Sequence, residues 1–162
     1  AKTFIYALVY GAGDAKIGAI VEGGTAKGKE LKKTFLKNLP ALKSLRDRVQ
    51  KASTRGYLKG LDGRKIFVRS PHSSLNTLLQ GGGSIAMKKS LEILQEKIDL
   101  NKLDAKFVAN IHDEWQIQVK ESQAECVGVI GVESIEEASK YFKMRCPLTG
   151  EYKIGNTWYE TH

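Results

Sequence analysis

The first third of the chain carries apolar residues at helical spacing. Over residues 1–10 they recur every three or four positions, and a glycine-rich stretch then stops the pattern. Residues 14–21 read as a short helix that Asp14 can cap. Two longer amphipathic helices are expected over residues 29–39 and 41–53, with Pro40 as the break between them. The other faces of these two helices are strongly basic. The pattern therefore predicts a helical N-terminal region.

The middle of the chain changes to strand-like segments and then to a long helix. Residues 57–59 and 65–69 flank Asp62-Gly63, a pair that favours a hairpin turn. A helix is expected from about residue 73 to residue 98. Gly81-Gly82-Gly83 interrupts it, and such a triplet suggests a kink or the close approach of another backbone.

The last third predicts a second pair of strands. Residues 106–111 and 115–119 are largely apolar, and His112-Asp113-Glu114 lies between them. A helix over residues 122–142 and a short strand-like tail over residues 152–158 complete the chain. No repeat or linker is visible, so the pattern predicts one unit of the α+β class.

The composition of the chain indicates its net charge and the cellular compartment that we expect. The 162 residues include 26 Lys and Arg against 18 Asp and Glu, a net charge of +8. This fits a phosphate-rich partner such as nucleic acid, although simple solubility explains it as well. Cys126 and Cys146 form no metal or disulfide pattern, and no apolar run could span a membrane. We expect a cytoplasmic protein without membrane contact. Because Ala1 opens directly into a helical pattern without a cap, we also expect the chain to begin inside an element.

Three sets of polar and aromatic residues could carry chemistry. Lys2, Tyr6 and Tyr10 are spaced i, i+4, i+8, which places a cation and two rings on one helix face. A lysine can hold a triphosphate while a ring stacks on a sugar or base. The alternative is an ordinary helix surface.

The same spacing recurs at the predicted long helix. His72, Asn76 and Gln80 would line one face, where the two amides could meet the hydrogen-bond acceptors that all base pairs present in the minor groove. A solvated polar face would give the same pattern.

The acidic tripeptide is the most specific of the three signals. Strands on both sides would hold the Asp113 and Glu114 carboxylates rigidly at a turn, and hard oxygen ligands of this kind suit Mg²⁺. Two such ions drive phosphoryl transfer in nucleotidyl-transfer sites. A polar hairpin turn without chemistry is the alternative interpretation.

In this order, the three sets resemble motifs of the family A DNA polymerases of short-tailed bacteriophages. Residues 2–11 resemble the O-helix motif of the fingers, entered just after its arginine. Residues 59–80 resemble the segment that lines the primer-template minor groove. His112-Asp113-Glu114 matches palm motif C, and residues 155–162 resemble the C-terminus of the phage enzymes.

The resemblance implies a fold and its parts. It indicates an α+β chain with fingers helices over residues 1–55, beginning within the O-helix. Residues 56–162 would be the C-terminal portion of the palm, where an antiparallel hairpin carries the His-Asp-Glu motif. Together they would form one incomplete polymerase domain.

The resemblance also assigns roles to single residues. Lys2 would bind the triphosphate of the incoming dNTP, Tyr6 would pack on its deoxyribose, and Tyr10 would stack beside the nascent base pair. Asp113 would be the metal ligand, and Glu114 an auxiliary catalytic carboxylate. The residues implied to contact DNA are His72, Asn76, Gln80, His112 and Arg64.

Four parts of the family pattern are absent from the sequence: the fingers arginine, palm motif A with its second metal-binding aspartate, the thumb with any processivity-factor loop, and the 3′-5′ exonuclease. The implied function is therefore the C-terminal part of a DNA-directed DNA polymerase, a nucleotidyltransferase that extends a primer by a two-metal mechanism. One set of ligands for its two Mg²⁺ ions would come from an N-terminal portion. Primer-template DNA and dNTPs would be the other partners. A processivity factor would bind outside this segment, and the compartment would be the cytoplasm of a bacterial host.

Two further hypotheses remain open. The chain could be a non-catalytic nucleic-acid-binding module that keeps only the basic face. It could also be a fragment that folds poorly alone, in which case the strands around Asp113 would expose an unpaired sheet edge.

Overall fold

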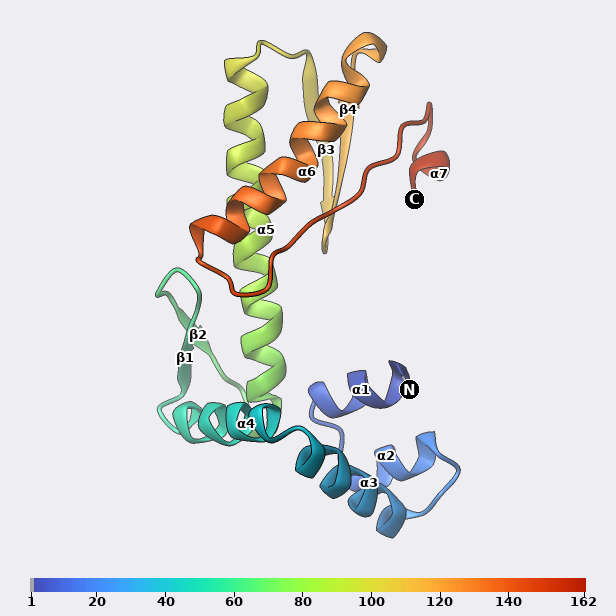
Figure 1. The fold of residues 1–162 in the computed structure, drawn as a ribbon, viewed down its shortest axis with the longest axis vertical. Coiled ribbons are helices and arrows are strands. Elements are labelled where there is room, and N and C mark those ends of the chain that lie inside the picture. Colours follow the sequence, from blue (N-terminus) through green and yellow to red (C-terminus); the bar gives the residue numbers. More distant parts are fainter. Residues whose placement is uncertain (1) are drawn as a thin grey trace. The chain divides into compact units, whose positions relative to one another are not determined.

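The structure, a computed structural model, describes residues 2–162 and contains two compact units. The first is Ala1–Gly81 and the second is Gly82–His162, and the long helix α5 (Ser74–Leu100) belongs to both (Figure 1). Mixed helices and short antiparallel sheets agree with the α+β class. The expected boundary between residues 55 and 56 separates the fingers from the palm. It is a different division from the two compact units, and it stays a prediction.

Four helices begin the first unit, as the apolar pattern predicts. Helix α3 begins at Thr25, four residues before its predicted start, because Gly24 is extended and forms the N-cap. Pro40 starts the next helix at a position where its missing N–H costs nothing. The residue before α1 lies outside the described part. The four helices are α1 (Lys2–Val9), α2 (Asp14–Ile20), α3 (Thr25–Asn38) and α4 (Pro40–Ser53).

The core of this unit forms where the helices meet. Leu8, Ile17 and Leu36 are buried together, and the rings of Phe4 and Phe35 pack edge to face with centroids 5.2 Å apart. Helices α2 and α3 approach very closely at Gly28, where an added Cβ would lie 1.9 Å from the carbonyl oxygen of Asp14. Glycine is required there for this packing.

A hairpin and a turn of 3-10 helix connect α4 to α5. Strands β1 (Tyr57–Lys59) and β2 (Lys65–Phe67) pair antiparallel, with Leu58 opposite Ile66. The predicted Asp62-Gly63 turn is present, and Gly63 has a φ of +85°. The 3-10 turn η1 (Pro71–Ser73) contains His72, so His72 precedes the long helix instead of lying on it.

The glycine triplet does not interrupt α5, and this expectation was wrong. The helix is continuous from Ser74 to Leu100. The predicted close approach does occur at Gly81, although a side chain makes it rather than a backbone: an added Cβ would lie 2.7 Å from Cδ1 of Ile66.

The second unit packs a hairpin and a helix with the end of α5. Strands β3 (Ala105–Ile111) and β4 (Glu114–Val119) pair antiparallel, with an irregularity between Phe107 and Ala109. Lys97 on α5 bonds Glu133 at 3.0 Å and Glu137 at 2.8 Å on the facing helix. Buried residues of this unit include Leu94, Ile98, Val127 and Ala138. The remaining elements are η2 (Glu121–Gln123), α6 (Ala124–Tyr141) and α7 (Trp158–Thr161).

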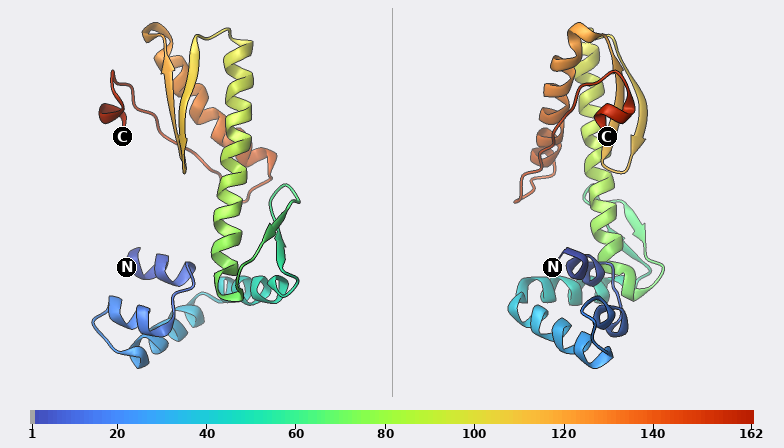
Figure 2. Two further views of the ribbon diagram at one scale, coloured as in Figure 1. Left: turned by 180° about the vertical axis from the view of Figure 1, so that it is seen from behind. Right: turned by 90° about the vertical axis from the view of Figure 1, so that its right-hand side faces the viewer.

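The C-terminal tail is not strand-like, and this expectation was also wrong. Residues 142–157 return along α6: the ring of Tyr152 lies against Gly128, and Gly150 lies against Ile135 (Figure 2). The tail ends in the short helix α7 beside the β3–β4 hairpin. Within the predicted strand only Tyr152 packs on α6, and residues 153–157 are exposed.

Candidate functional site

Helix α1 presents the predicted cation and rings on one exposed face. The rings of Tyr6 and Tyr10 stack with centroids 6.0 Å apart and planes 14° from parallel. The Lys2 ammonium lies 5.9 Å from the centroid of Tyr6. Both rings are about half exposed, at 49% and 52%, because Leu8 on the opposite face fills the core. The three side chains therefore form an open ladder that a flat ligand could reach.

Gly11 connects this ladder to the predicted DNA-contacting segment. Its φ is +77°, and an added Cβ would lie 2.4 Å from the carbonyl oxygen of His72. Both observations require glycine, since other residues adopt this conformation only with strain and none has room. The end of α1 is thus packed on η1, and Lys2, Tyr6 and Tyr10 share a unit with the segment that starts α5.

The two amides of that segment differ in environment. Asn76 is half-buried, and its Oδ1 is shielded without a hydrogen-bond partner among residues 2–162. A buried acceptor left unpaired costs about 1–3 kcal/mol. Gln80 is exposed. These two residues lie on consecutive turns of α5, as the spacing predicts.

Arg64 is held by its own hairpin turn. Its Nε donates to Oδ2 of Asp62 at 2.6 Å, and its backbone N–H donates to Oδ1 at 3.1 Å. Desolvation raises the pKa of Asp62, but these hydrogen bonds outweigh it and leave the pKa below its usual value. Arg64 is fixed at the turn, where its guanidinium stays exposed.

His112 and Asp113 form the two-residue turn between β3 and β4, whereas Glu114, which was expected between the strands, is the first residue of β4. His112 has a φ of +55°, the left-handed conformation that a tight hairpin needs at its first turn position. This conformation costs a non-glycine residue about 1–2 kcal/mol. Both side chains are exposed, and the Asp113 carboxylate has no hydrogen bond or ion pair with any residue in the range 2–162.

The neighbouring carboxylate, that of Glu114, has a bonding partner at each of its two oxygens. Glu114 accepts from Nε2 of Gln116 at 2.5 Å through Oε1, and its Oε2 lies 3.0 Å from Nδ1 of His162. The hydrogen bond from Gln116 is the largest of the effects that lower the pKa of Glu114; burial opposes it, and His162 and Trp158 add to it. Sequence reasoning missed these three partners. Only Gln116 had a signal, since residues two apart share a strand face.

These side chains offer part of a metal site. Among residues 2–162 there is no cluster of three or more His, Cys, Asp or Glu side chains suited to a metal ion. Asp113, in the turn between the strands, is exposed, and its carboxylate has no partner among residues 2–162. Mg²⁺ is often bound by one or two carboxylates, with water and substrate phosphates completing its octahedron, so this residue fits one position of such a site.

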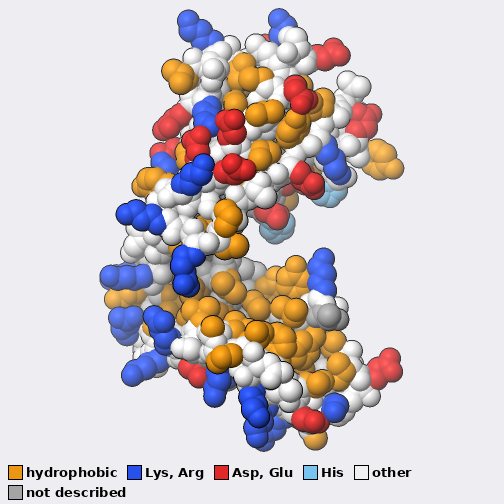
Figure 3. Space-filling model, in the orientation of Figure 1, with side chains coloured by type: hydrophobic (Ala, Val, Ile, Leu, Met, Phe, Trp, Pro, Cys, Tyr) orange, Lys and Arg blue, Asp and Glu red, His pale blue; other side chains and the backbone are white. Residues whose placement is uncertain are grey.

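Charge is divided unevenly between the two units. Ala1–Gly81 has 16 Lys and Arg against 5 Asp and Glu, a net charge of +11, whereas Gly82–His162 has 10 against 13, a net charge of −3. In Figure 3 basic side chains lie over β1–β2 and α4, and acidic ones gather over α6. The capacity to attract phosphate therefore lies in the first unit.

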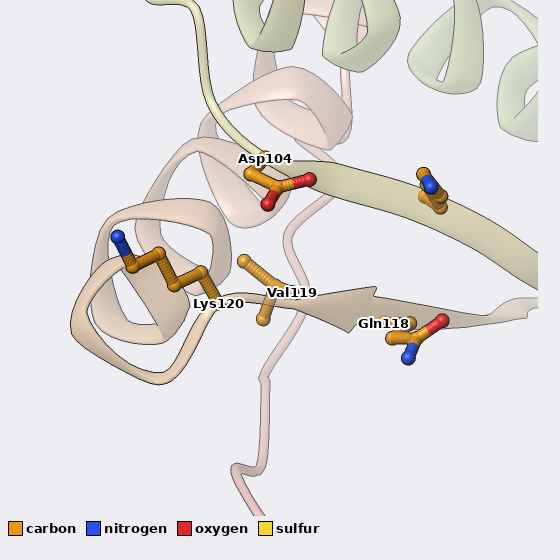
Figure 4. Close-up of a pocket in the computed structure, with 5 residues that line it drawn as sticks. Asp104, Gln118, Val119 and Lys120 are labelled. Carbon is orange, nitrogen blue, oxygen red and sulfur yellow. The ribbon is translucent and has the colours of Figure 1, made fainter.

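The far end of the β3–β4 hairpin provides a contrast to its turn. A shallow pocket there is lined by Asp104, Lys106, Gln118, Val119 and Lys120 (Figure 4). No motif in the sequence indicates a site at this end. Asp104 therefore places a carboxylate at the end of the hairpin opposite to Asp113.

A comparison with known protein families shows which family this chain belongs to. Residues 1–160 match the family described as DNA polymerase family A. The chain belongs to that family. The DNA-directed DNA polymerase of Enterobacteria phage T3 is 42% identical and that of Escherichia phage T7 is 40% identical, each over 100% of this chain. The chain spans 26% of each of these relatives, about a quarter of their length.

A solved polymerase shares the fold. The POL domain of Pol1 from M. smegmatis, in complex with DNA primer-template and dNTP, superposes with a TM-score of 0.76. It covers 85% of this chain at 17% sequence identity, and the match covers 26% of that chain. The expected membership in family A is confirmed by these comparisons, while the roles of individual residues remain predictions. In the described part of the chain no helix is long and apolar enough to cross a membrane.

Proposed function

We propose that this chain is the fingers and part of the palm of a DNA-directed DNA polymerase. The reaction joins a dNTP to a primer: the 3′-hydroxyl oxygen bonds to the α-phosphorus, pyrophosphate leaves and the hydroxyl proton is lost. The observation that carries the proposal is the exposed ladder of Lys2, Tyr6 and Tyr10 on α1, in a chain that belongs to family A. A ladder of this kind suits a ligand with a triphosphate and a flat base.

Three side chains of α1 would hold the incoming nucleotide. The Lys2 ammonium is exposed and would neutralise part of the triphosphate charge. The face of Tyr6 would pack on the deoxyribose, and Tyr10, one turn later, would stack beside the nascent base pair. Packing of Gly11 on His72 would keep this ladder in register with the DNA-contacting segment of the same unit.

The other contacts would be to primer and template. Asn76 and Gln80 can donate to the acceptors that every base pair shows in the minor groove, so they would bind DNA without reading its sequence. Arg64 and His72 would approach the duplex from the hairpin and from η1, and His112 would lie at the primer end. The net charge of +11 in the first unit supports DNA as the partner.

Asp113 would hold Mg²⁺ together with a second aspartate that this sequence lacks. When bound, the two ions would activate the primer hydroxyl and neutralise the leaving pyrophosphate. The carboxylate of Asp113, which is exposed and makes no hydrogen bond within residues 2–162, fits this role. Because half of the ligands would come from the N-terminal portion of the polymerase, we expect no primer extension by this chain alone.

Primer extension with Mg²⁺ and dNTPs tests the proposal. The chain would be assayed alone, and then joined to or mixed with the N-terminal portion of a related phage polymerase that ends before the residue aligned with Lys2. Extension only with the N-terminal portion would support a composite two-metal site. Inactivity in both, with DNA binding that weakens as salt rises, would favour the non-catalytic binding module.

A further inference from the structure

Two neighbouring carboxylates on the β3–β4 hairpin have opposite environments. Asp113 is exposed and makes no hydrogen bond or ion pair within residues 2–162, whereas both oxygens of Glu114 are bonded. The side chain of Glu114 is 34% exposed, although it lies one residue away. Two carboxylates beside the same turn are therefore used in different ways.

The bonds around Glu114 run in one consistent direction. Nε2 of Gln116 donates to Glu114, which orients the amide so that its Oε1 must accept. The hydroxyl of Thr161 lies 3.2 Å from this Oε1 and 3.1 Å from the carbonyl oxygen of Trp158, so its single proton is shared between the two acceptors. Two separate paths thus lead from the end of the chain to the Glu114 carboxylate, one through Thr161 and Gln116 and the other directly from His162.

Helix α7 needs such an anchor to keep its place. It has four residues, none of them buried, and a helix this short is not stable in isolation. The tail residues 153–157 are all exposed, so the last residue before α7 that packs on α6 is Tyr152, against Gly128. Polar contacts with Glu114 and Gln116 are what join α7 to strand β4.

We propose that Glu114 is a positioning residue that, with Gln116, docks helix α7 onto strand β4, and that it is not a cation ligand. Two positions of the strand, 114 and 116, point to the same face and form the dock. The dock places Trp158, Tyr159 and His162, which line an open surface pocket, next to the turn that carries Asp113. The dock itself is argued from the contacts above. Its importance for catalysis rests on the proposed function, in which Asp113 binds the metal ion.

Amide hydrogen exchange of the intact chain tests the dock. The N–H groups of Glu160 and His162 bond within α7, to Thr157 and Trp158, and report its order. Glu114→Ala should raise their exchange rates by about tenfold, because it removes the His162 contact and leaves the Gln116 amide unoriented. Thr161→Val removes only the path through Gln116 and should raise the rates less. Combining the two changes should exceed Glu114→Ala only slightly, since the Thr161 path depends on the Gln116 amide that Glu114 orients.

Two matched variants distinguish loss of the contacts that position α7 from a general disturbance of the structure around it. Thr161→Ser keeps the hydroxyl and should retain the exchange rates of the original chain. Asp113→Asn alters the adjacent carboxylate, which is outside the relay, and should also leave α7 protected. Unchanged exchange in Glu114→Ala, or loss of protection in Asp113→Asn, would overturn the proposal.

A paramagnetic probe asks whether Glu114 binds cations. Titrated Mn²⁺ should broaden the amide signals of residues 112–114, and this broadening should be lost in Asp113→Asn but kept in Glu114→Ala. Loss of broadening in Glu114→Ala would make Glu114 a ligand and overturn the assignment. If the original chain shows no broadening, Asp113 does not bind the ion without the second aspartate of the N-terminal portion, and the titration is repeated in the reconstituted polymerase. The exchange rates still decide whether the dock exists.

Discussion

The two compact units differ in net charge and in the side chains that they expose. Ala1–Gly81 has a net charge of +11 and exposes stacked rings, while Gly82–His162 has a net charge of −3 and exposes a carboxylate at a tight turn. The proposed phosphate-binding surface and the proposed metal ligand therefore belong to different units. We expect that substitutions can disturb DNA binding and metal binding separately.

The largest effect should come from the acidic turn. We expect Asp113→Asn to lower nucleotide incorporation by the reconstituted enzyme about a thousandfold or more, because metal-ion charge stabilisation is worth several kcal/mol. Asp104→Asn removes a carboxylate at the far end of the same hairpin and should change the rate less than about threefold. Single-turnover incorporation measures both, and similar rates for the two variants would remove Asp113 from the metal site.

Next in size is a change that unfolds only the first unit. Gly28→Ala places a Cβ 1.9 Å from a backbone oxygen, and we expect a loss of about 3 kcal/mol in unfolding free energy. Both tryptophans, Trp115 and Trp158, lie in the second unit, so their fluorescence reports that unit alone while circular dichroism reports both.

Gly24→Ala is the control, since an added Cβ there meets nothing within 4 Å and only the N-cap preference for glycine is lost, about 1 kcal/mol or less. An earlier transition by circular dichroism, with unchanged fluorescence, would confirm that the units unfold separately. A shift of both signals together would show that the comparison between the units does not extend to stability.

A third change tests where DNA phosphates bind. Lys29, Lys33 and Lys37 form an exposed stripe at i, i+4, i+8 on α3, and none has an ion pair within residues 2–162. Reversing all three to Glu should reduce the slope of log affinity against log salt by up to about 2.7, or roughly 0.9 for each phosphate that these lysines neutralise. Fluorescence anisotropy with duplex DNA measures the slope.

The matched control reverses three exposed lysines of the second unit, Lys140, Lys143 and Lys153. We expect this variant to keep most of the original slope. Equal reductions in the two variants would mean that net charge alone governs binding and that neither unit has a defined phosphate surface.

A smaller effect is expected on the choice of sugar. The hydroxyl of Tyr6 would lie near the 3′ position and replace the hydrogen bond that a dideoxynucleotide lacks. Tyr6→Phe should therefore raise discrimination against dideoxynucleotides about tenfold, the value of one hydrogen bond of roughly 1.4 kcal/mol. Competitive incorporation measures the ratio, and Tyr10→Phe, one turn along the same face, should leave it unchanged.

The smallest effect concerns the ion pairs between α5 and α6. Desolvation lowers the pKa of Lys97, but its bonds to Glu137 and Glu133 outweigh it and raise the pKa above the usual value. The contribution to stability is therefore complete below about pH 10.4, the unfolded value, and is lost as the pH rises through the folded pKa. Lys97→Met should cost about 1 kcal/mol at about pH 8 and less at higher pH.

Lys88→Met is the reference, since Lys88 is exposed and has no ion pair with any residue from 2 to 162. Urea unfolding followed by Trp fluorescence measures both variants. A constant difference between them up to about pH 11, above the unfolded lysine pKa, would contradict the role of the ammonium charge.

Much of the fold and half of the site could be predicted from sequence. Helical spacing at Lys2, Tyr6 and Tyr10 predicts a shared face because the period of the helix is local and needs no partner. The His112-Asp113 turn between β3 and β4 is local in the same sense. Gly81-Gly82-Gly83 led to a wrong prediction, because packing of Ile66 on Gly81 compensates for the weak helix propensity of the triplet.

Sequence alone specifies the order of the elements, the family and the side chains that face outward from single helices and turns. Three features emerge only from the folded chain: Gly11 packs on His72, the tail follows α6 to a helix, and Glu114 has bonding partners while Asp113 has none in the described part of the chain. The reason is physical: period, capping and turn chemistry act over a few residues, whereas Glu114 meets His162 across 48 positions, and only packing brings them together.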